Sequence, residues 1–461
     1  MDTPTNFDPV TGQPIVVNTM QPQKKSKKGL IIGIIIGVLV LAAAVAVGLF
    51  FLLGKDPKTQ VSLAITNTAK EFSDKNLLFN DLSFEDYDKS KERTATFEIE
   101  TEIPSVGDVS VSATSSIDDE KMQVYGDVNV AFIPSIKYVI QLDKDNLSIY
   151  TPLFDQYVFN YGYNDKNSGF IAELLKEQNV DLNDILSKFY ELAMTPNSEE
   201  ANEELFKSFL ELGEKLEFEK TDSKEYEIDG KDVDCKGYKT VVSGDDIKDC
   251  IIGYYKSIDE LSGNMVKVNG MSYSELMEMS FENAFDNLDE FEIVFYLYDD
   301  KVAGLTMQPD DEEMVEIAFK GGDYRAQNID FLVDDEVQFS IEGEIDDDVE
   351  TYELALADNT PITAKIAYNS NDGELTLTAG PKGQEISLDF IISKSKNKLD
   401  IEMKTVDFGD VYFGGKLSLS TGAKFEDIDA GTEVDLGNAS EEELQGIVQE
   451  LYSIVMGTMG F

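Results

Sequence analysis

The sequence contains no histidine and no tryptophan, and it has only two cysteines among its 461 residues. Without histidine, the chain cannot form a Ser-His-Asp or Cys-His catalytic group, a histidine-ligated zinc site or the usual neutral-pH switch. Arginine is nearly absent as well, since Arg93 and Arg325 are the only two. Paired guanidinium contacts to phosphate or carboxylate groups are therefore scarce. These absences favour a binding role over catalysis.

Acidic residues dominate the charge of the chain. They outnumber basic residues by 90 to 38, which gives a formal net charge of −52. The imbalance lies beyond residue 54, because residues 1–54 carry four lysines against two aspartates. Such a surface repels nucleic acid and anionic lipid, so neither is expected as a partner.

A long apolar run lies near the N-terminus. Leu30 to Leu53 contains no charged residue, and a helix of this length crosses a hydrocarbon core of about 30 Å. The run continues past Ala42-Ala43-Ala44, which predicts an uncleaved anchor and not a removed signal peptide. The lysine cluster at residues 24–28 places the N-terminus in the cytoplasm by the positive-inside rule. The sequence therefore predicts a flexible tail over 1–28, a transmembrane helix over 29–54 and an extracellular remainder.

Small residues recur along the predicted anchor. Gly29, Gly33 and Gly37 are four residues apart and share one helix face, which permits close approach of a second helix. This spacing predicts self-association or a helical partner in the membrane.

Residues 55–290 show both strand and helix periods. A short stalk helix is expected over Thr59–Phe72, and strict alternation from Arg93 onward predicts an antiparallel sheet with one buried face. Apolar stripes predict amphipathic helices near residues 182–193, 205–216, 247–258 and 272–288. Tyr226 to Val242 is typical of a hairpin that turns at Asp229-Gly230. We interpret this part as an extracellular α+β domain.

Residues 291–461 are the most regular part of the sequence. Turn-forming or charged residues recur about every twelve residues between 299 and 396, and alternating runs lie between them. This pattern predicts about ten strands in one antiparallel meander, which must curl because wide twisted sheets do not stay flat. Ser440 and Glu443 form a capping box for a C-terminal helix. The predicted fold class is α+β: an N-terminal transmembrane helix, then a large, curved, half-barrel-like meander with packed amphipathic helices.

Two resemblances accompany these patterns. Residues 7–14 (FDPVTGQP), the lysine cluster and the glycine-rich anchor resemble uncharacterised single-pass, membrane-anchored surface proteins of Gram-positive anaerobes. The strand-helix-strand plan with its hairpin at Tyr226–Val242 is similar, at the level of fold, to half-barrel lipoproteins that carry lipids. The second resemblance implies an apolar groove between sheet and helices.

The two cysteines are fifteen residues apart and lie outside the predicted membrane segment. Cys235 stands on a predicted strand, and Cys250 stands on the apolar face of the next helix. This arrangement predicts a structural disulfide, with two buried free thiols as the alternative. A catalytic thiol is not expected, because no histidine can act as its base.

Two acidic turns form a candidate metal site. In an antiparallel meander, alternate turns emerge at the same edge, so clusters two turns apart could approach each other. Carboxylate oxygens are suitable calcium ligands, and solvated turns are the alternative. The candidate ligands for Ca²⁺ are Asp310, Asp311, Glu313, Asp334, Asp335 and Glu336.

No catalytic motif is complete. Ser393 and Lys396 have the spacing of a serine-lysine acylase but lack its supporting elements, and chance carboxylate pairs are certain among so many acids. We therefore predict a non-enzymatic, membrane-anchored extracellular domain that needs no cofactor and binds a protein partner or an apolar ligand. A carboxylate-based envelope hydrolase and a structural or sensory subunit of a membrane complex are the alternatives.

Overall fold

The computed structural model describes residues 56–103, 107–131, 133–151, 157–178, 180–194, 205–261, 271–281, 290–309, 313–357, 362–407, 412–428 and 432–458. The predicted tail, the predicted transmembrane helix and its three glycines, Gly29, Gly33 and Gly37, lie outside these ranges. None of the helices within them combines the length and apolar content that a bilayer-spanning helix needs. The predicted extracellular location stays a prediction.

Twenty strands form one sheet. Their bounds are β1 Arg93–Ile103, β2 Gly107–Ile117, β3 Lys121–Val130, β4 Ile133–Asp143, β5 Asn146–Tyr150, β6 Tyr157–Gly162, β7 Glu219–Ile228, β8 Lys231–Ser243, β9 Glu290–Tyr298, β10 Lys301–Pro309, β11 Val315–Gly321, β12 Asn328–Val333, β13 Glu336–Asp346, β14 Val349–Leu356, β15 Ile362–Asn369, β16 Glu374–Pro381, β17 Ile386–Ser395, β18 Lys398–Asp407, β19 Tyr412–Thr421 and β20 Thr432–Asp435.

The chain enters the sheet in its middle. From β1 it proceeds through neighbouring strands to β6, crosses by helices to the opposite end, and returns from β7 through consecutive antiparallel pairs to β19. There β19 pairs with β1 along the whole strand, from Arg93 opposite Thr421 to Glu102 opposite Tyr412. The last strand, β20, crosses to the far edge and pairs with β6, and this pairing is parallel.

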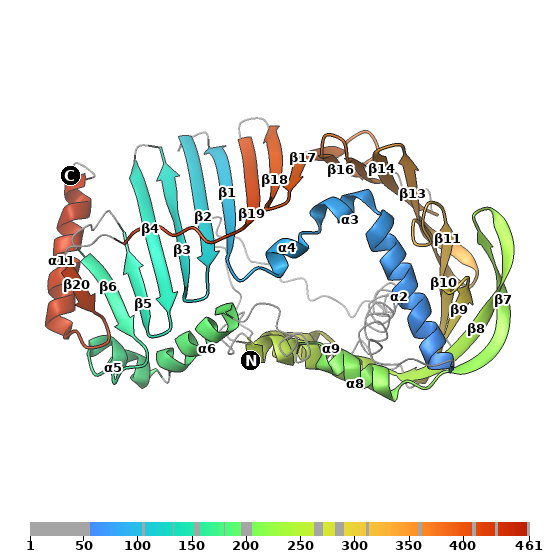
Figure 1. The fold of residues 1–461 in the computed structure, drawn as a ribbon, viewed down its shortest axis with the longest axis horizontal. Coiled ribbons are helices and arrows are strands. Elements are labelled where there is room, and N and C mark those ends of the chain that lie inside the picture. Colours follow the sequence, from blue (N-terminus) through green and yellow to red (C-terminus); the bar gives the residue numbers. More distant parts are fainter. Residues whose placement is uncertain are drawn as a thin grey trace, which may run out of the picture.

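Alternation gives the sheet two different faces. Paired residues on neighbouring strands point to the same face of the sheet. Tracing these pairs from strand to strand shows that Tyr238, Phe295 and Leu305, at one end of the sheet, share a face with Leu377 and Phe97 farther along. We call this apolar side the inner face, because the sheet curves around the helices that pack on it (Figure 1). The other side, the outer face, carries hydroxyl and carboxylate groups that bond across strands, such as Thr376 with Asp389 at 2.6 Å.

Helices line the inner side of this curve (Figure 1). The two largest inner-face cores involve α2, α8 and α9 at one end, and α3 and α4 farther along. At the other end, α6 packs on Leu142 and Tyr161. The bounds are α2 Pro57–Lys75, α3 Leu77–Leu82, α4 Glu85–Asp88, α5 Phe170–Glu177, α6 Leu182–Met194, α8 Lys207–Lys215, α9 Gly244–Leu261, α10 Tyr273–Phe281 and α11 Glu441–Thr458.

Two segments cover parts of the outer face. The hairpin β7–β8 bends over β9–β11 and encloses a small core around Tyr226, Cys235 and Ala303. At the opposite end, residues 422–428 cross over β3, where Glu426 exchanges two backbone hydrogen bonds with the buried side chain of Gln123, at 2.6 and 2.9 Å. The outer face is therefore covered over β9–β11 by the hairpin and over β3 by residues 422–428.

The predicted fold class was wrong. Sequence reasoning expected a transmembrane helix and a meander over residues 291–461 that was separate from an α+β domain over 55–290. Instead, β8 pairs with β9 and β19 pairs with β1, so strands from both sides of residue 290 form one sheet. Alternation of apolar and polar residues identifies strands, but it does not show which distant strands become neighbours. The pairing of β1 with β19 joins segments that are separated by most of the chain.

Several local predictions are confirmed. The hairpin turns at Asp229-Gly230, and both residues have positive φ, as the type I′ turn requires. Ser272 with Glu275 forms a reciprocal capping box, and so does Ser440 with Glu443. The predicted stalk helix exists as α2, but it packs into the inner face of the sheet and is not a spacer.

Candidate functional site: an apolar groove beside helix α2

Helix α2 begins with a strong start signal. Asp56 is the N-cap, and its carboxylate accepts hydrogen bonds from the backbone N–H of Thr59 at 3.0 Å and from the Thr59 hydroxyl at 2.7 Å. Pro57 follows at the first helical position, where its fixed φ suits the helix. The helix then buries Val61, Ala64 and Ile65 against the sheet.

Polar contacts fix α2 to the hairpin between β9 and β10. The Thr68 hydroxyl accepts the Val302 N–H at 3.0 Å. The Glu71 carboxylate pairs with Lys301 at 2.8 Å and also accepts the Arg325 N–H at 3.1 Å. Burial alone would raise the pKa of Glu71, but Lys301, the Arg325 amide and Lys75 together lower it to about 2. The helix therefore has a defined position on β10.

A buried carboxylate fixes the junction between α2 and α3. Glu350 on β14 is 1% exposed, and it accepts hydrogen bonds from the side chains of Asn76, Tyr324 and Tyr352 at 2.7 to 3.0 Å. It also accepts the first backbone N–H groups of α3, from Leu77 at 2.8 Å and Leu78 at 3.3 Å. Burial raises the pKa of Glu350, and the two amides oppose that effect. Because both oxygens are satisfied, this group holds α3 in place.

An apolar groove of 690 Å³ lies between α2, α3 and the inner face of β9–β11. Phe72 and Phe79 form its aromatic wall, with ring centroids 5.7 Å apart, and Phe72 also stands edge-on to Tyr324. Lys70, on the exposed side of α2, is the one charged residue among the described lining residues. The others are Ile65, Thr66, Thr68, Ala69, Ser73, Phe295, Val302, Leu305, Phe319 and Ala326.

The groove has the size and lining of a small-molecule site. Ligand pockets are typically about 300–1,000 Å³ and mostly apolar, with few polar groups. The hydroxyl of Thr68 is already bonded to Val302 and Ala64, so the groove offers little hydrogen bonding to a ligand. Its chemistry suits a hydrocarbon chain.

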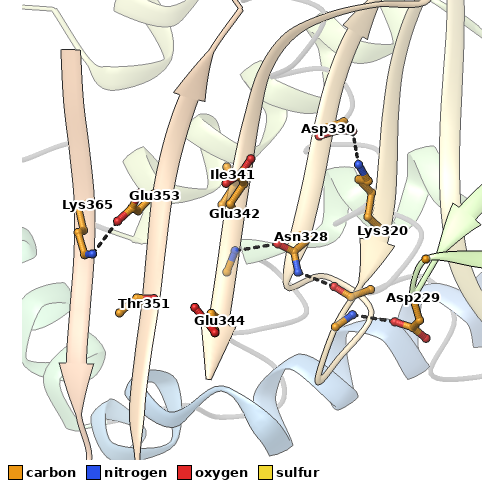
Figure 2. A pocket seen from close by; sticks show the side chains of 14 residues that line it. Asp229, Lys320, Asn328, Asp330, Ile341, Glu342, Glu344, Thr351, Glu353 and Lys365 are labelled. Atoms are coloured by element: carbon orange, nitrogen blue, oxygen red, sulfur yellow. Dashed lines mark hydrogen bonds and ion pairs between the residues drawn. The ribbon is translucent and has the colours of Figure 1, made fainter. Parts of the chain in front are cut away.

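A second cavity, of 630 Å³, lies on the outer face and is polar. Figure 2 shows that both lysines of its lining are already paired: Lys320 with Asp330 at 3.3 Å, and Lys365 with Glu353 at 2.6 Å. Asp229, from the tip of the β7–β8 hairpin, accepts the Gly322 N–H at 2.8 Å. The Asp229 contact attaches the tip of the bent β7–β8 hairpin to the sheet, and the two ion pairs join neighbouring strands.

The predicted disulfide is not present. Cys235 and Cys250 are both buried free thiols. Cys235 lies in the outer core with Tyr226, whereas Cys250 lies on α9 in the inner core. Strand alternation explains this, because Tyr238 of β8 faces α9, and Cys235, three positions away on the same strand, faces the opposite side of the sheet. The sheet therefore stands between the two sulfur atoms.

The predicted calcium ligands are only partly described. Asp310 and Asp311 lie outside the described residues. Asp334 does approach the neighbouring turn, but its carboxylate is used to accept the Met314 N–H at 2.9 Å. Within the described ranges, no group of three or more histidine, cysteine or acidic residues is placed to hold a metal ion. Calcium binding through Glu313, Asp334, Asp335 and Glu336 stays a prediction.

The resemblance to half-barrel lipoproteins implied an apolar groove between sheet and helices, but sequence reasoning identified none of its lining residues and missed Glu350. Within the predicted stalk helix, Val61, Ile65, Thr68 and Phe72 recur at helical spacing, and such a stripe indicates a helix that packs on a core. Glu350 could not be distinguished in the sequence, because it is one of 90 acidic residues. Only the folded structure shows that it is buried and accepts hydrogen bonds from several donors.

Comparisons with known proteins add little. No family model and no curated protein matches the chain. Weak structural similarity exists to a DUF1329 family protein from Desulfovibrio piger, with 8% identity, TM-score 0.14, and coverage of 78% of this chain and 95% of that one. A similar likeness exists to a putative outer membrane lipoprotein-sorting protein domain from Vibrio parahaemolyticus, with 10% identity, TM-score 0.13, and coverage of 77% and 94%. TM-scores this low carry no argument, and the resemblance to Gram-positive surface proteins gains no support.

Proposed function

We propose that the chain binds an apolar ligand, such as a lipid acyl chain, in the groove beside α2, and that it does so without catalysis. The observation that supports this most directly is the 690 Å³ groove with four phenylalanines and a single charged residue in its lining. Each buried CH₂ group contributes about 0.8 kcal/mol, which corresponds to roughly a fourfold change in Kd. Affinity should therefore rise with chain length until the groove is full.

The test is calorimetric titration of the purified chain with neutral fatty alcohols of increasing length. A blocking variant, Ala69→Phe, should abolish binding, because Ala69 is exposed and lines the groove. Leu63→Phe is the matched control, since Leu63 is an exposed residue of the same helix that is not among the lining residues. Equal binding by both variants, or no dependence on chain length, would contradict the proposal.

Catalysis needs a separate assay, because the sequence leaves a carboxylate-based hydrolase as the alternative. Cell-wall and glycan substrates should be incubated with the same protein. Hydrolysis that a single Asp or Glu substitution abolishes would refute the non-enzymatic part of the proposal.

A further inference from the structure

The inner face continues well beyond the groove. Past α3 and α4, which pack on β14–β19, it extends over β1, β2, β3 and β4. Large apolar side chains that share this face are between 36% and 47% exposed in the described part of the chain. They are Phe97, Ile103, Val111, Ile136, Ile140 and Phe413. We call this set the open apolar face.

Its composition is unusual for this molecule. Although 28% of the residues in the chain are charged, no charged residue shares this face between Ala95 and Ile103 of β1, or at the facing positions of β2, β3, β4 and β19. Glu98, Glu100 and Glu102 point to the outer face, and Arg93, at the start of β1 and outside this stretch, is the one inner-face charge on these five strands. Soluble monomers rarely expose apolar patches of more than a few hundred Å², so an occupant is expected.

We propose that the open apolar face is a second binding surface, which takes the acyl chains of individual lipid molecules. A protein partner is a poorer fit, because protein interfaces make about one hydrogen bond per 100–200 Å² and have polar rims. Here the side chains with hydrogen-bonding groups are few, and hydrocarbon requires none. A second copy of the chain would bring together two molecules with a net charge of −52 each, whereas a neutral lipid meets no such repulsion.

This surface is distinct from the groove beside α2, since α3 and α4 lie between them on the sheet. The proposal does not depend on the groove being occupied. It predicts that the protein holds acyl chains at two places along one face.

The absence of tryptophan gives a direct test, because one introduced tryptophan is the sole indole emitter. Phe413 and Tyr412 are consecutive residues of β19 with similar exposure, 38% and 42%, and they point to opposite faces. Phe413→Trp therefore reports on the open apolar face, Tyr412→Trp is its matched control, and Phe79→Trp reports on the groove. Each variant is incubated with phosphatidylcholine vesicles whose acyl chains carry bromine, which quenches indole on contact. The vesicles are then removed by centrifugation, and emission of the supernatant is compared with that after unbrominated vesicles.

The Phe413→Trp variant should lose most of its emission, and the Tyr412→Trp variant should lose almost none. Phe97→Trp, on the neighbouring strand, provides a second reporter if Phe413→Trp does not fold, as judged by its thermal melt. Equal quenching at positions 412 and 413, or no quenching at either 413 or 97, would overturn the proposal. Quenching at 79 alone overturns this surface and leaves the groove standing, whereas quenching at 413 alone supports this surface and contradicts the groove.

Discussion

At the scale of single residues, two glutamates attach α2 and α3 to the sheet in different ways. Glu350 is a buried acceptor with five donors around it. Glu71 is a mostly buried carboxylate that pairs with Lys75 and Lys301. The first determines where α3 starts, and the second ties α2 to the β9–β10 hairpin, so together they define the walls of the groove.

Glu71→Gln should lower the free energy of unfolding at neutral pH by about 2 kcal/mol, given the size of the pKa shift and partial solvent screening. The pKa of Glu71 is lowered from 4.5 to about 2 in the folded protein. Its contribution is therefore fully present above about pH 4.5 and is lost as the pH falls towards 2. Urea unfolding of both proteins across this range should show curves that converge at the acid end. Glu85→Gln, which breaks an exposed ion pair with Lys89, should change the acid profile much less, because solvent screens both groups.

The two thiols should be unreactive in the folded protein. Burial raises the pKa of both Cys235 and Cys250 to about 11, and the thiolate is the reactive form. A thiol reagent at pH 8 should label neither residue until denaturant is added, and then both. An intact mass that increases by two hydrogens on reduction would reveal a disulfide and contradict the free-thiol structure.

At the scale of elements, the sequence predicted features that depend on neighbouring residues, but not those that depend on contacts between distant residues. The Asp229-Gly230 turn, the capping boxes and the alternating strands follow from short-range chemistry, and all of them appear as expected. The position of α2 on β10 and the bend of β7–β8 over β9–β11 depend on contacts between residues far apart in sequence. The groove arises from those contacts, which explains why its lining could not be derived from any one segment.

The bent β7–β8 hairpin packs so closely on β10 that position 304 has room only for glycine. A Cβ atom there would lie 2.4 Å from the Tyr226 ring, so Gly304→Ala should destabilise the protein by about 1–3 kcal/mol. Gly446→Ala is the matched control, because Gly446 lies within α11 with open space around it. Replacing a helical glycine there should stabilise by about 0.5–1 kcal/mol. Thermal melts of the two variants should shift in opposite directions.

At the scale of the whole molecule, the net charge of −52 opposes compaction. Salt screens this repulsion, since the Debye length falls from about 30 Å at 0.01 M to about 3 Å at 1 M. The melting temperature should therefore rise when sodium chloride is added, even though individual ion pairs such as Lys301–Glu71 weaken. A melting temperature that is constant or falls over this range would show that local ion pairs outweigh the net repulsion.

The place where the chain enters the sheet has a consequence for how the protein is made. During synthesis, β1 can pair with β2 early, but the strand for its other edge, β19, emerges from the ribosome only after some three hundred further residues. Until then β1 presents an unpaired edge, and unpaired edges recruit other chains. Pairings between such distant segments also form slowly. The nascent chain therefore has a long interval in which a holding chaperone, or rapid delivery to its final compartment, would determine how much of it folds.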